Sequence, residues 1–429
     1  MLSPDYHRLR VLYPDVFGFA RGKYIPISAA TGEVSYSVGI FGVGYDRALI
    51  PAPGAQLLDG LGDMRAVYAV DNARPSWQEG TGIVIADLFQ DGAPLAISPR
   101  HALRKAVADL AAFGYRASVG IELEGYVLQP DGNGGWDPWD TPSAYCYGTG
   151  PLVDPIGLLD EIMASAAACG IELETAASEY DAPQFELTVK HTDPLAAIDN
   201  TFLLKLLCRE AAAVRGLLMT FLGRPLGDRG GNGLHVNISF TNDAGEPLLD
   251  DPDAPDGLSK MAHHAIAGML EHHEGLTALC APTVNAYKRL RPGQLSGYWA
   301  NWGYDHRSVA VRVPNERGPG ARLESRLPDG AANPYIATAA LLQACVLGIE
   351  AAVDPPPREE GDGLETANTD RCAPDNLGLA LDALEADSPL IDAVGAGLVA
   401  NFVAMKREEW RRFSEAVTDW ELREYLPFH

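Results

Sequence analysis

Carboxylate and imidazole side chains recur in this sequence at spacings that suit a divalent cation. Glu122 and Glu124 are two residues apart in an otherwise apolar segment, and His235 follows a glycine-rich stretch. At the two-residue period of a strand both carboxylates project from one face, where a cation or a proton must neutralise them. Oxygen ligands with a single imidazole suit Mg²⁺ or Mn²⁺ better than Zn²⁺. The pattern therefore predicts a magnesium or manganese site, to which three further residues could contribute: Glu179, Glu186 and Glu324.

Basic side chains gather in one window of an otherwise acidic chain. Residues 285–326 contain Lys288 and seven arginines against three acidic residues, while the whole chain has a formal net charge of −25. Because a guanidinium grips carboxylates and phosphates through two parallel hydrogen bonds, the window predicts a site for a carboxylate or a small phosphate. A salt-bridged sheet face is the competing interpretation, but exposed ion pairs contribute only about 0–1 kcal/mol each and do not require this density.

Alternation within this window predicts two strands. Val309, Val311 and Val313 alternate with Ala310 and Arg312, and residues 322–327 alternate in the same way. A strand with one buried face has this period of two. If the polar faces of the two strands meet, four charged side chains enter one common space: Arg312, Arg322, Glu324 and Arg326.

The elements that must position these residues form a mixed pattern. Residues 1–97 are strand-rich, with turn signals such as Gln90-Asp91-Gly92, and predict a small β-rich domain. Residues 98–429 interleave strands with long helices, which predicts an α+β catalytic domain. The strands are expected at 117–128, 171–189, 235–240 and 309–327, and the helices at 101–113, 154–169, 194–218, 258–279, 334–352 and 377–425. The doublets His263-His264 and His272-His273 are expected on an exposed helix face.

Composition argues against several classes of protein. The pI near 4.7 means that the long-range field repels nucleic acids and anionic membranes. No apolar run approaches the ~18–20 residues of a membrane span, and the first residues lack the basic-then-apolar order of a signal peptide. The six cysteines are scattered without a C-x-x-C pair, which indicates free thiols in a reducing compartment. We therefore expect a cytoplasmic protein without nucleic-acid or membrane partners.

A nucleotide site in this chain would not be a P-loop. The sequence contains no G-x-x-x-x-G-K-[ST], and the glycines at 39, 42 and 44 match a nucleotide loop only weakly. If ATP binds, arginines and metal ions must hold its phosphates.

Taken together, the motifs resemble the glutamine synthetase family, class I-like, over almost the whole chain. The matching segments follow one another in the family's order and lie at 18–23, 99–100, 120–124, 179–186, 232–239, 285–290, 307–308, 311–314, 322–326 and 333–335. The resemblance implies an N-terminal β-grasp domain (1–97) and a catalytic domain (98–429) whose antiparallel sheet forms a funnel packed with helices. It also implies a homo-oligomer, either a hexameric ring or a dodecamer.

The resemblance further implies two divalent-metal sites and an ATP-dependent ligase reaction. The implied metal ligands fall into two sets, Glu124, Glu179 and Glu186 for one Mg²⁺ or Mn²⁺, and Glu122, His235 and Glu324 for the other. Phosphoryl transfer from ATP to the γ-carboxylate of L-glutamate brings several anions together, so metals and arginines must neutralise the developing charge. An amine would then attack the γ-glutamyl phosphate.

Substrate and nucleotide contacts are implied in the same way. Arg289, Arg307 and Arg326 are the expected catalytic residues: the first receives the α-amino acid part of glutamate, the second faces the transferring phosphoryl group, and the third lies beside the reacting end. Gly231 would complete the glutamate site. The implied nucleotide contacts are Glu174, Asn237, Ser239, Arg307, Arg312 and Arg322, with Asn237 standing where the family has a second histidine.

Two departures from the family pattern concern ammonium. Most members carry a Glu shortly after the Lys-Arg-Leu motif, where Leu295 stands here, and the family's Asp-Gly-Ser-Ser loop has no clear counterpart near 41–44. The aromatics Tyr298, Trp299 and Trp302 either line an apolar amine pocket or belong to the core. We therefore expect a ligase that joins L-glutamate to an organic amine, with Leu295 in the substrate site. The alternatives are a true glutamine synthetase that uses ammonia, and an inactive structural or regulatory relative.

Overall fold

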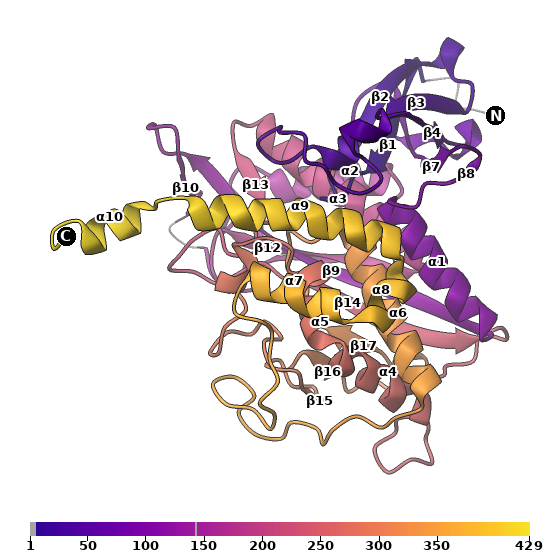
Figure 1. Cartoon of the computed structure of the whole chain (residues 1–429), viewed down its shortest axis with the longest axis vertical. Coiled ribbons are helices and arrows are strands. Elements are labelled where there is room, and N and C mark those ends of the chain that lie inside the picture. The colour runs from indigo at the N-terminus through magenta and orange to yellow at the C-terminus, as the bar shows by residue number, and fades with distance from the viewer. Residues whose placement is uncertain (1–5, 142–143) are drawn as a thin grey trace.

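The residues that the structure describes, 6–141 and 144–429 of a computed structural model, form a mixed arrangement of helices and strands (Figure 1). Two four-stranded sheets precede the first long helix, with strand orders β2-β1-β6-β5 and β3-β4-β7-β8. Their strands are β1 (Arg8–Pro14), β2 (Ala20–Pro26), β3 (Glu33–Ser37), β4 (Asp63–Val67), β5 (Arg74–Pro75), β6 (Thr81–Ile85), β7 (Asp87–Gln90) and β8 (Ala93–Pro94). The Asn333 side chain donates to the Asp15 and Val16 carbonyls at 2.9 and 3.2 Å, which fixes the β1–β2 turn on the rest of the chain.

A nine-stranded sheet dominates the remainder, with the order β11-β12-β9-β14-β17-β16-β15 and with β10 and β13 also pairing β9. Its long central strand is β9 (Tyr115–Pro130), in which Val119, Ile121 and Leu123 are fully buried while Glu122 and Glu124 are partly exposed. The other strands are β10 (Trp136–Pro138), β11 (Leu173–Ser178), β12 (Gln184–Thr192), β13 (Leu218–Thr220), β14 (Leu234–Asn242), β15 (Trp302–Tyr304), β16 (Val311–Val313) and β17 (Leu323–Ser325). Alternation thus gives the sheet one apolar face and one carboxylate-bearing face.

Helices begin where the sequence supplies capping residues. Ser98, Asp193 and Asn333 accept hydrogen bonds from the first turns of α1, α3 and α6, and each is followed by a proline, whose missing N–H costs nothing at that position. The helices are α1 (Pro99–Ala112), α2 (Leu158–Ala168), α3 (Pro194–Ala213), α4 (Lys260–Glu271), α5 (His273–Cys280), α6 (Pro334–Ala351), α7 (Leu377–Ala386), α8 (Ser388–Val394), α9 (Ala396–Glu415) and α10 (Asp419–Tyr425).

Helix α6 is the core helix of the structure. Its length and composition would allow it to cross a membrane, but 78% of it is buried inside the protein, where it packs against α1 and α4. The crossing with α4 is so close that a Cβ on Gly348 would lie 2.1 Å from the His264 carbonyl oxygen, and one on Gly268 would lie 2.0 Å from that of Ala344. Glycine at both positions is therefore required by packing.

Some predicted elements are divided in the structure. The helix expected at 258–279 breaks at His272 into α4 and α5, and the one expected at 377–425 is four helices, α7 to α10. The prediction of exposed histidine doublets is wrong: His273 is only 2% exposed, and His263 and His272 pair with Asp256 and Asp387 at 3.0 and 2.8 Å. Neither carboxylate partner was predicted: Asp256 precedes the helix by four residues, and Asp387 lies 115 positions from His272.

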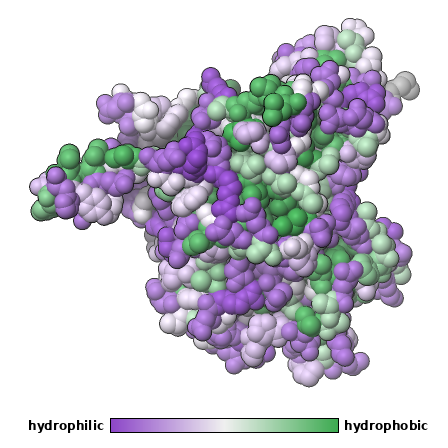
Figure 2. Space-filling view, in the orientation of Figure 1, coloured by the Kyte–Doolittle hydropathy of each residue, from purple (hydrophilic) through white to green (hydrophobic). Residues whose placement is uncertain are grey.

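The C-terminal end projects from the body of the molecule (Figure 1). Figure 2 shows hydrophobic residues on this projecting segment. Val417, Leu422, Leu426 and Phe428 are exposed in this segment, as are the aromatic rings of Trp420 and Tyr425.

Candidate active site

Strand register brings the predicted metal ligands together on one face of the large sheet. His235 on β14 lies opposite Glu122 on β9, and Glu186 on β12 lies opposite Glu124. The imidazole of His235 has its Nδ1 3.2 Å from a Glu122 oxygen, its Nε2 3.8 Å from a Glu124 oxygen, and its Nδ1 3.8 Å from a Glu324 oxygen. The single imidazole is thus surrounded by carboxylates from two neighbouring strands.

Two groups of these side chains have the geometry to hold a cation. Glu122, His235 and Glu324 form one, and Glu124, Glu186 and His235 form the other, with the potential ligand atoms of each group all within 4.8 Å of one another. The first group is the set that the sequence implied. The second contains His235 where the sequence implied Glu179, whose carboxylate instead accepts the Tyr180 N–H at 2.9 Å, although Glu179 lines the same cavity.

The charge in this cluster fits divalent cations. Burial and then the neighbouring carboxylates, Glu122 foremost, raise the pKa of Glu186 to about 8. Burial would also raise the pKa of Glu122, but the hydrogen bond and charge of His235 hold it at about 2. Carboxylates crowded in this way repel one another unless a cation lies between them. Oxygen-rich ligand sets with one imidazole are those that Mg²⁺ and Mn²⁺ prefer.

Glu324 pairs with two arginines of the arginine-rich segment 285–326. Its side chain is fully buried and accepts from Arg312 at 2.6 Å and from Arg326 at 2.5 Å. Arg312 also pairs with Asp305. The predicted common space of the two polar strand faces is therefore present, completed by Arg322, whose Nε donates to Asn237 at 3.3 Å. All four charged side chains form ion pairs: Glu324 pairs with Arg312 and Arg326, and Arg322 pairs with Glu316 at 3.2 Å. Arg312, with two carboxylate partners, has little capacity left for a ligand.

Arg307 differs from its neighbours because it is exposed and uncommitted. Within the described part of the chain it forms no hydrogen bond or ion pair, yet it lines the cavity that holds the carboxylate cluster. A free guanidinium at the rim of a metal cluster is suited to bind a phosphate.

Arg289 and Gly231 build the wall of the same cavity. Arg289 is 4% exposed, and its guanidinium donates to the Leu327 and Arg326 carbonyls, both at 3.1 Å, and to that of Ser296 at 3.5 Å. A Cβ on Gly231 would lie 2.5 Å from the Gly223 oxygen, so only glycine fits there. Arg289 thus joins the wall to the segment 293–296, which carries Leu295.

This cavity, about 480 Å³, contains most of the residues predicted for glutamate and metal. They are Glu122, Glu124, Glu179, Glu186, Gly231, His235, Arg289, Leu295, Arg307 and Arg326. The aromatics expected as one option for the amine pocket belong to the core instead: Trp299 and Trp302 donate to the Leu364 and Pro356 carbonyls at 3.2 and 2.7 Å. Sequence reasoning missed other lining residues, namely Cys146, Tyr147, Tyr180, Asp181, Arg224, Asp228 and Arg229.

A second cavity of about 340 Å³ adjoins the cluster on the other side and shares Glu122 with the first. It contains four of the predicted nucleotide contacts, Glu174, Asn237, Ser239 and Arg322, whereas Arg307 lines the first cavity and Arg312 lines neither. Thr188 and His191 were missed by sequence reasoning. Two polar cavities meeting at a carboxylate cluster could hold two anionic substrates with cations between them.

Comparison with known proteins identifies the family. Residues 96–425 match the family described as glutamine synthetase, catalytic domain. A glutamine synthetase of Pyrococcus abyssi (strain GE5 / Orsay) is 31% identical over 446 residues, which cover 99% of this chain and 97% of that protein. One of Rhizobium meliloti (strain 1021) is 33% identical over 427 residues, covering 96% and 94%. This chain belongs to the glutamine synthetase family.

Solved structures agree with this assignment. The structure described as "Apo GmaS without ligand" superposes with a TM-score of 0.86 at 31% identity, covering 99% of this chain and 100% of that one. The "GmaS/ADP complex-Conformation 1" has the same TM-score and identity and covers 99% and 97%. The protein is accordingly an ATP-dependent carboxylate–amine ligase of the glutamine synthetase type.

Proposed function

We propose that the enzyme joins the γ-carboxylate of L-glutamate to an organic amine, with ATP as the phosphoryl donor, and releases a γ-glutamylamide. The observation that carries this proposal is the apolar side chain at the cavity rim: Leu295 is 54% exposed there, in a segment of the family that usually bears a carboxylate. The structure neighbour GmaS, a γ-glutamylmethylamide synthetase, gives independent support.

The two cavities suit the two anionic substrates. We assign glutamate to the cavity with Gly231, Arg289 and Arg326, and ATP to the groove with Glu174, Ser239 and Arg322. Bound Mg²⁺ or Mn²⁺ would neutralise the phosphate oxygens and the substrate carboxylate as they approach each other. Glu122, Glu124, Glu179, Glu186, His235 and Glu324 are the residues that would hold these cations.

Two arginines would contact the reacting groups. Arg307 is free to bind the transferring phosphoryl group, where a positive charge stabilises the charge that develops. Arg326 is held by Glu324 at 2.5 Å, and the Nε of its guanidinium is buried without a partner. An orphaned buried donor costs free energy until a ligand oxygen satisfies it. We assign it to the reacting end of glutamate.

An organic amine suits the rim better than ammonium does. Leu295, Tyr147 and Tyr180 line the cavity with large exposed side chains. An amine that buries apolar surface against them gains roughly 25 cal/mol per Å². Ammonium entering the same place loses hydration, and the rim segment 293–296 provides no carboxylate to compensate or to accept its proton. An amine of low pKa arrives uncharged, so that aryl amines and hydrazines are favoured over polyamines.

The proposed function has two alternatives: a glutamine synthetase that uses ammonia, and an inactive relative. The curated relatives are named glutamine synthetase, which favours ammonia as the amine. Asp181 and Glu179 also line the cavity, although Asp181 accepts a hydrogen bond from the Gly230 N–H. An inactive relative is disfavoured, because such a scaffold need not keep a complete set of metal ligands with free Arg307 beside it.

The proposal also includes the domain organisation, the location and the assembly of the enzyme. We propose a β-grasp domain at 1–97, a catalytic domain at 98–429 whose sheet contributes to a funnel, and a cytoplasmic homo-oligomer. The exposed apolar side chains of the projecting segment 417–428 support association with a second copy, because large exposed apolar patches mark interaction surfaces.

A product analysis tests the function. The enzyme is incubated with ATP, Mg²⁺ and L-glutamate together with methylamine, aniline, phenylhydrazine, putrescine or ammonia, and products are identified by mass spectrometry. We expect ADP, phosphate and a γ-glutamylamide in equal amounts. Arg307→Gln should abolish the product, whereas Arg65→Gln, a change in an exposed pair with Glu33 on another sheet, should not. Formation of glutamine alone across the panel would contradict the proposal.

A further inference from the structure

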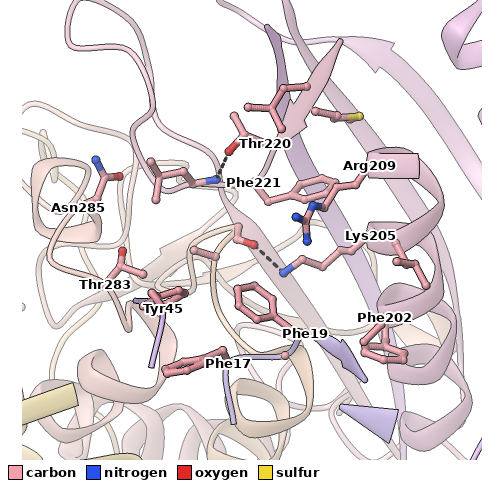
Figure 3. Close-up of a pocket in the computed structure, with 18 of the residues that line it drawn as sticks. Phe17, Phe19, Tyr45, Phe202, Lys205, Arg209, Thr220, Phe221, Thr283 and Asn285 are labelled. Carbon is pink, nitrogen blue, oxygen red and sulfur yellow. Dashed lines mark hydrogen bonds between the residues drawn. The ribbon is translucent and has the colours of Figure 1, made fainter. Parts of the chain in front are cut away.

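A third cavity, of about 380 Å³, lies apart from the carboxylate cluster and contains none of its residues (Figure 3). It opens between the β1–β2 turn, helix α3 and the segments that follow β13 and α5. Residues of seven separate segments of the chain meet around it, and neither substrate proposed above has a contact there.

Aromatic rings form much of its lining. Phe17 stacks on Tyr45 with ring centroids 4.4 Å apart, and Phe19 meets the edge of Tyr45 at 5.8 Å. Phe202 and Phe221 contribute from α3 and from the end of β13. Figure 3 shows these rings around one space, with Lys205 and Arg209 reaching toward it from α3. The cavity offers a planar or apolar body a large contact area.

The two cations are the unusual feature of this aromatic cavity. Lys205 and Arg209 are one helical turn apart. Lys205 donates to the Gly330 and Ala332 carbonyls at 2.8 and 3.1 Å, which uses two of its three N–H donors. Burial foremost, opposed by the charge of Asp329 and assisted by that of Arg209, lowers the pKa of Lys205 to about 8. The Lys205 ammonium therefore keeps one free N–H donor at a buried position that disfavours its charged form.

Arg209 has still fewer partners. It is exposed, lies 6.0 Å from the Phe19 ring, and forms no hydrogen bond or ion pair with the residues that the structure describes. Its sequence neighbour Glu210 is committed elsewhere, because its carboxylate binds Arg10 at 2.6 Å and the Trp77 indole at 2.7 Å. Among the described residues no carboxylate forms a hydrogen bond or an ion pair with Lys205 or Arg209, although Asp329 attracts Lys205 and Glu210 attracts Arg209 without direct contact.

The one acidic residue in the lining is already matched. Glu409 accepts from Lys406 at 2.9 Å and from the Val284 N–H at 3.3 Å. Lys406 in turn lies 4.7 Å from the Phe17 ring. Because Glu409 is paired with Lys406, no carboxylate in the lining pairs with Lys205 or Arg209, and both cations lie beside an apolar surface.

We propose that this cavity binds a small organic carboxylate with an aromatic body. The rings of Phe17, Phe19 and Tyr45 would contact the body, and the carboxylate would accept hydrogen bonds from Arg209 and from the spare donor of Lys205. An anion there relieves the repulsion between the two cations, and the charge-assisted hydrogen bonds that it forms are among the strongest in proteins.

The proposed glutamate site adjoins the new cavity, so the test must distinguish binding in one from binding in the other. Asn285 lines the new cavity and exchanges hydrogen bonds with the backbone of Arg224, a residue of the glutamate-side cavity. Saturating L-glutamate and Mg²⁺–ADP would therefore be present in every binding measurement. Under these conditions a carboxylate that binds only in the glutamate site is displaced.

The test is calorimetric titration of the substrate-saturated protein with phenylacetate, and with benzyl alcohol, phenethylamine and acetate as probes lacking one element of the proposed ligand. We expect saturable binding of phenylacetate and at least tenfold weaker binding of the other three. Arg209→Gln should weaken phenylacetate about tenfold or more, and Phe19→Ala should also weaken it. Arg65→Gln on β4 is the matched control. The melting temperature of every variant should equal that of the unmodified protein.

Three results would overturn the proposal. The first is absence of saturable phenylacetate binding in the presence of glutamate. The second is binding of benzyl alcohol as tight as that of phenylacetate, because the cations would then be irrelevant. The third is a correctly folded Arg209→Gln variant that binds phenylacetate as tightly as the unmodified protein.

Discussion

His235 and Glu122 face each other directly across the pairing of β14 with β9, and the imidazole Nδ1 lies 3.2 Å from the carboxylate. This contact depends on strand register, because a slip of β14 by one residue would turn His235 to the opposite face of the sheet, away from Glu122. The same register aligns Glu186 with Glu124. The geometry of the carboxylate cluster is thus set by backbone pairing over the length of β9.

His235→Asn should lower the affinity for Mn²⁺ at both candidate metal positions, because His235 belongs to both groups of ligands. We expect a loss of at least tenfold, measured by Mn²⁺ titration with and without ADP. His264→Asn, on α4 and outside both groups, is the control. Unchanged Mn²⁺ affinity in His235→Asn would show that the cluster is not a metal site.

Arg289→Lys should impair the use of glutamate far more than the binding of nucleotide. Lysine keeps the charge but lacks the planar fork that spaces the donors of a guanidinium, so about 1.5–3 kcal/mol of hydrogen bonding is at stake. The Michaelis constant for glutamate should rise about tenfold to a hundredfold, with little change in the dissociation constant of ADP. Arg291→Lys alters a nearby exposed arginine and serves as control. A change confined to nucleotide binding would contradict the assignment.

The ligand-bearing strands could be predicted from the sequence because their pattern is local. Glu122 and Glu124 alternate with buried Val119, Ile121 and Leu123, and this period of two is visible without knowledge of the fold. That Glu324 joins them could not be derived from its own strand. The family resemblance implied Glu324 as a ligand, and the structure explains its position by the long-range pairing of β17 with β14.

Contacts between residues far apart in the chain could not be predicted from the sequence. Trp299 and Trp302 follow the Leu295 segment closely, but their indoles donate to carbonyls of residues 364 and 356, more than fifty positions away in the chain. Tyr147 and Tyr180 line the cavity instead, and only the position of Tyr180 beside Glu179 could have drawn attention to it. The cavity around Lys205 and Arg209 likewise depends on the packing of the β1–β2 turn over α3, which no local pattern reveals.

The enzyme should be active only as an oligomer. The family resemblance implies that the N-terminal domain of a neighbouring subunit closes the funnel, and we propose that the exposed apolar side chains of 417–428 offer a contact between copies. Light scattering under assay conditions, combined with a dilution series, measures mass and turnover together. We expect specific activity to fall as the oligomer dissociates. Full activity in a species of monomer mass, 45.9 kDa, would refute the prediction.

Leu295→Glu should shift the enzyme toward ammonia. The new carboxylate would attract the ammonium ion and accept its proton, while it would remove apolar surface that an organic amine contacts. We expect kcat/KM for ammonia to rise and that for the preferred organic amine to fall. Leu295→Gln, of similar shape but uncharged, should lower the use of the organic amine without the gain for ammonia. An equal effect of Glu and Gln on ammonia would show that charge at this position is irrelevant.

The most direct test of the proposed function is the selectivity of the unmodified enzyme. The kcat/KM for ammonia and for each organic amine is measured at saturating ATP, Mg²⁺ and L-glutamate, and the amide products are quantified by mass spectrometry. We predict that at least one partly apolar amine exceeds ammonia in kcat/KM. A higher kcat/KM for ammonia than for every organic amine in the panel would contradict the account and identify the enzyme as a glutamine synthetase that uses ammonia.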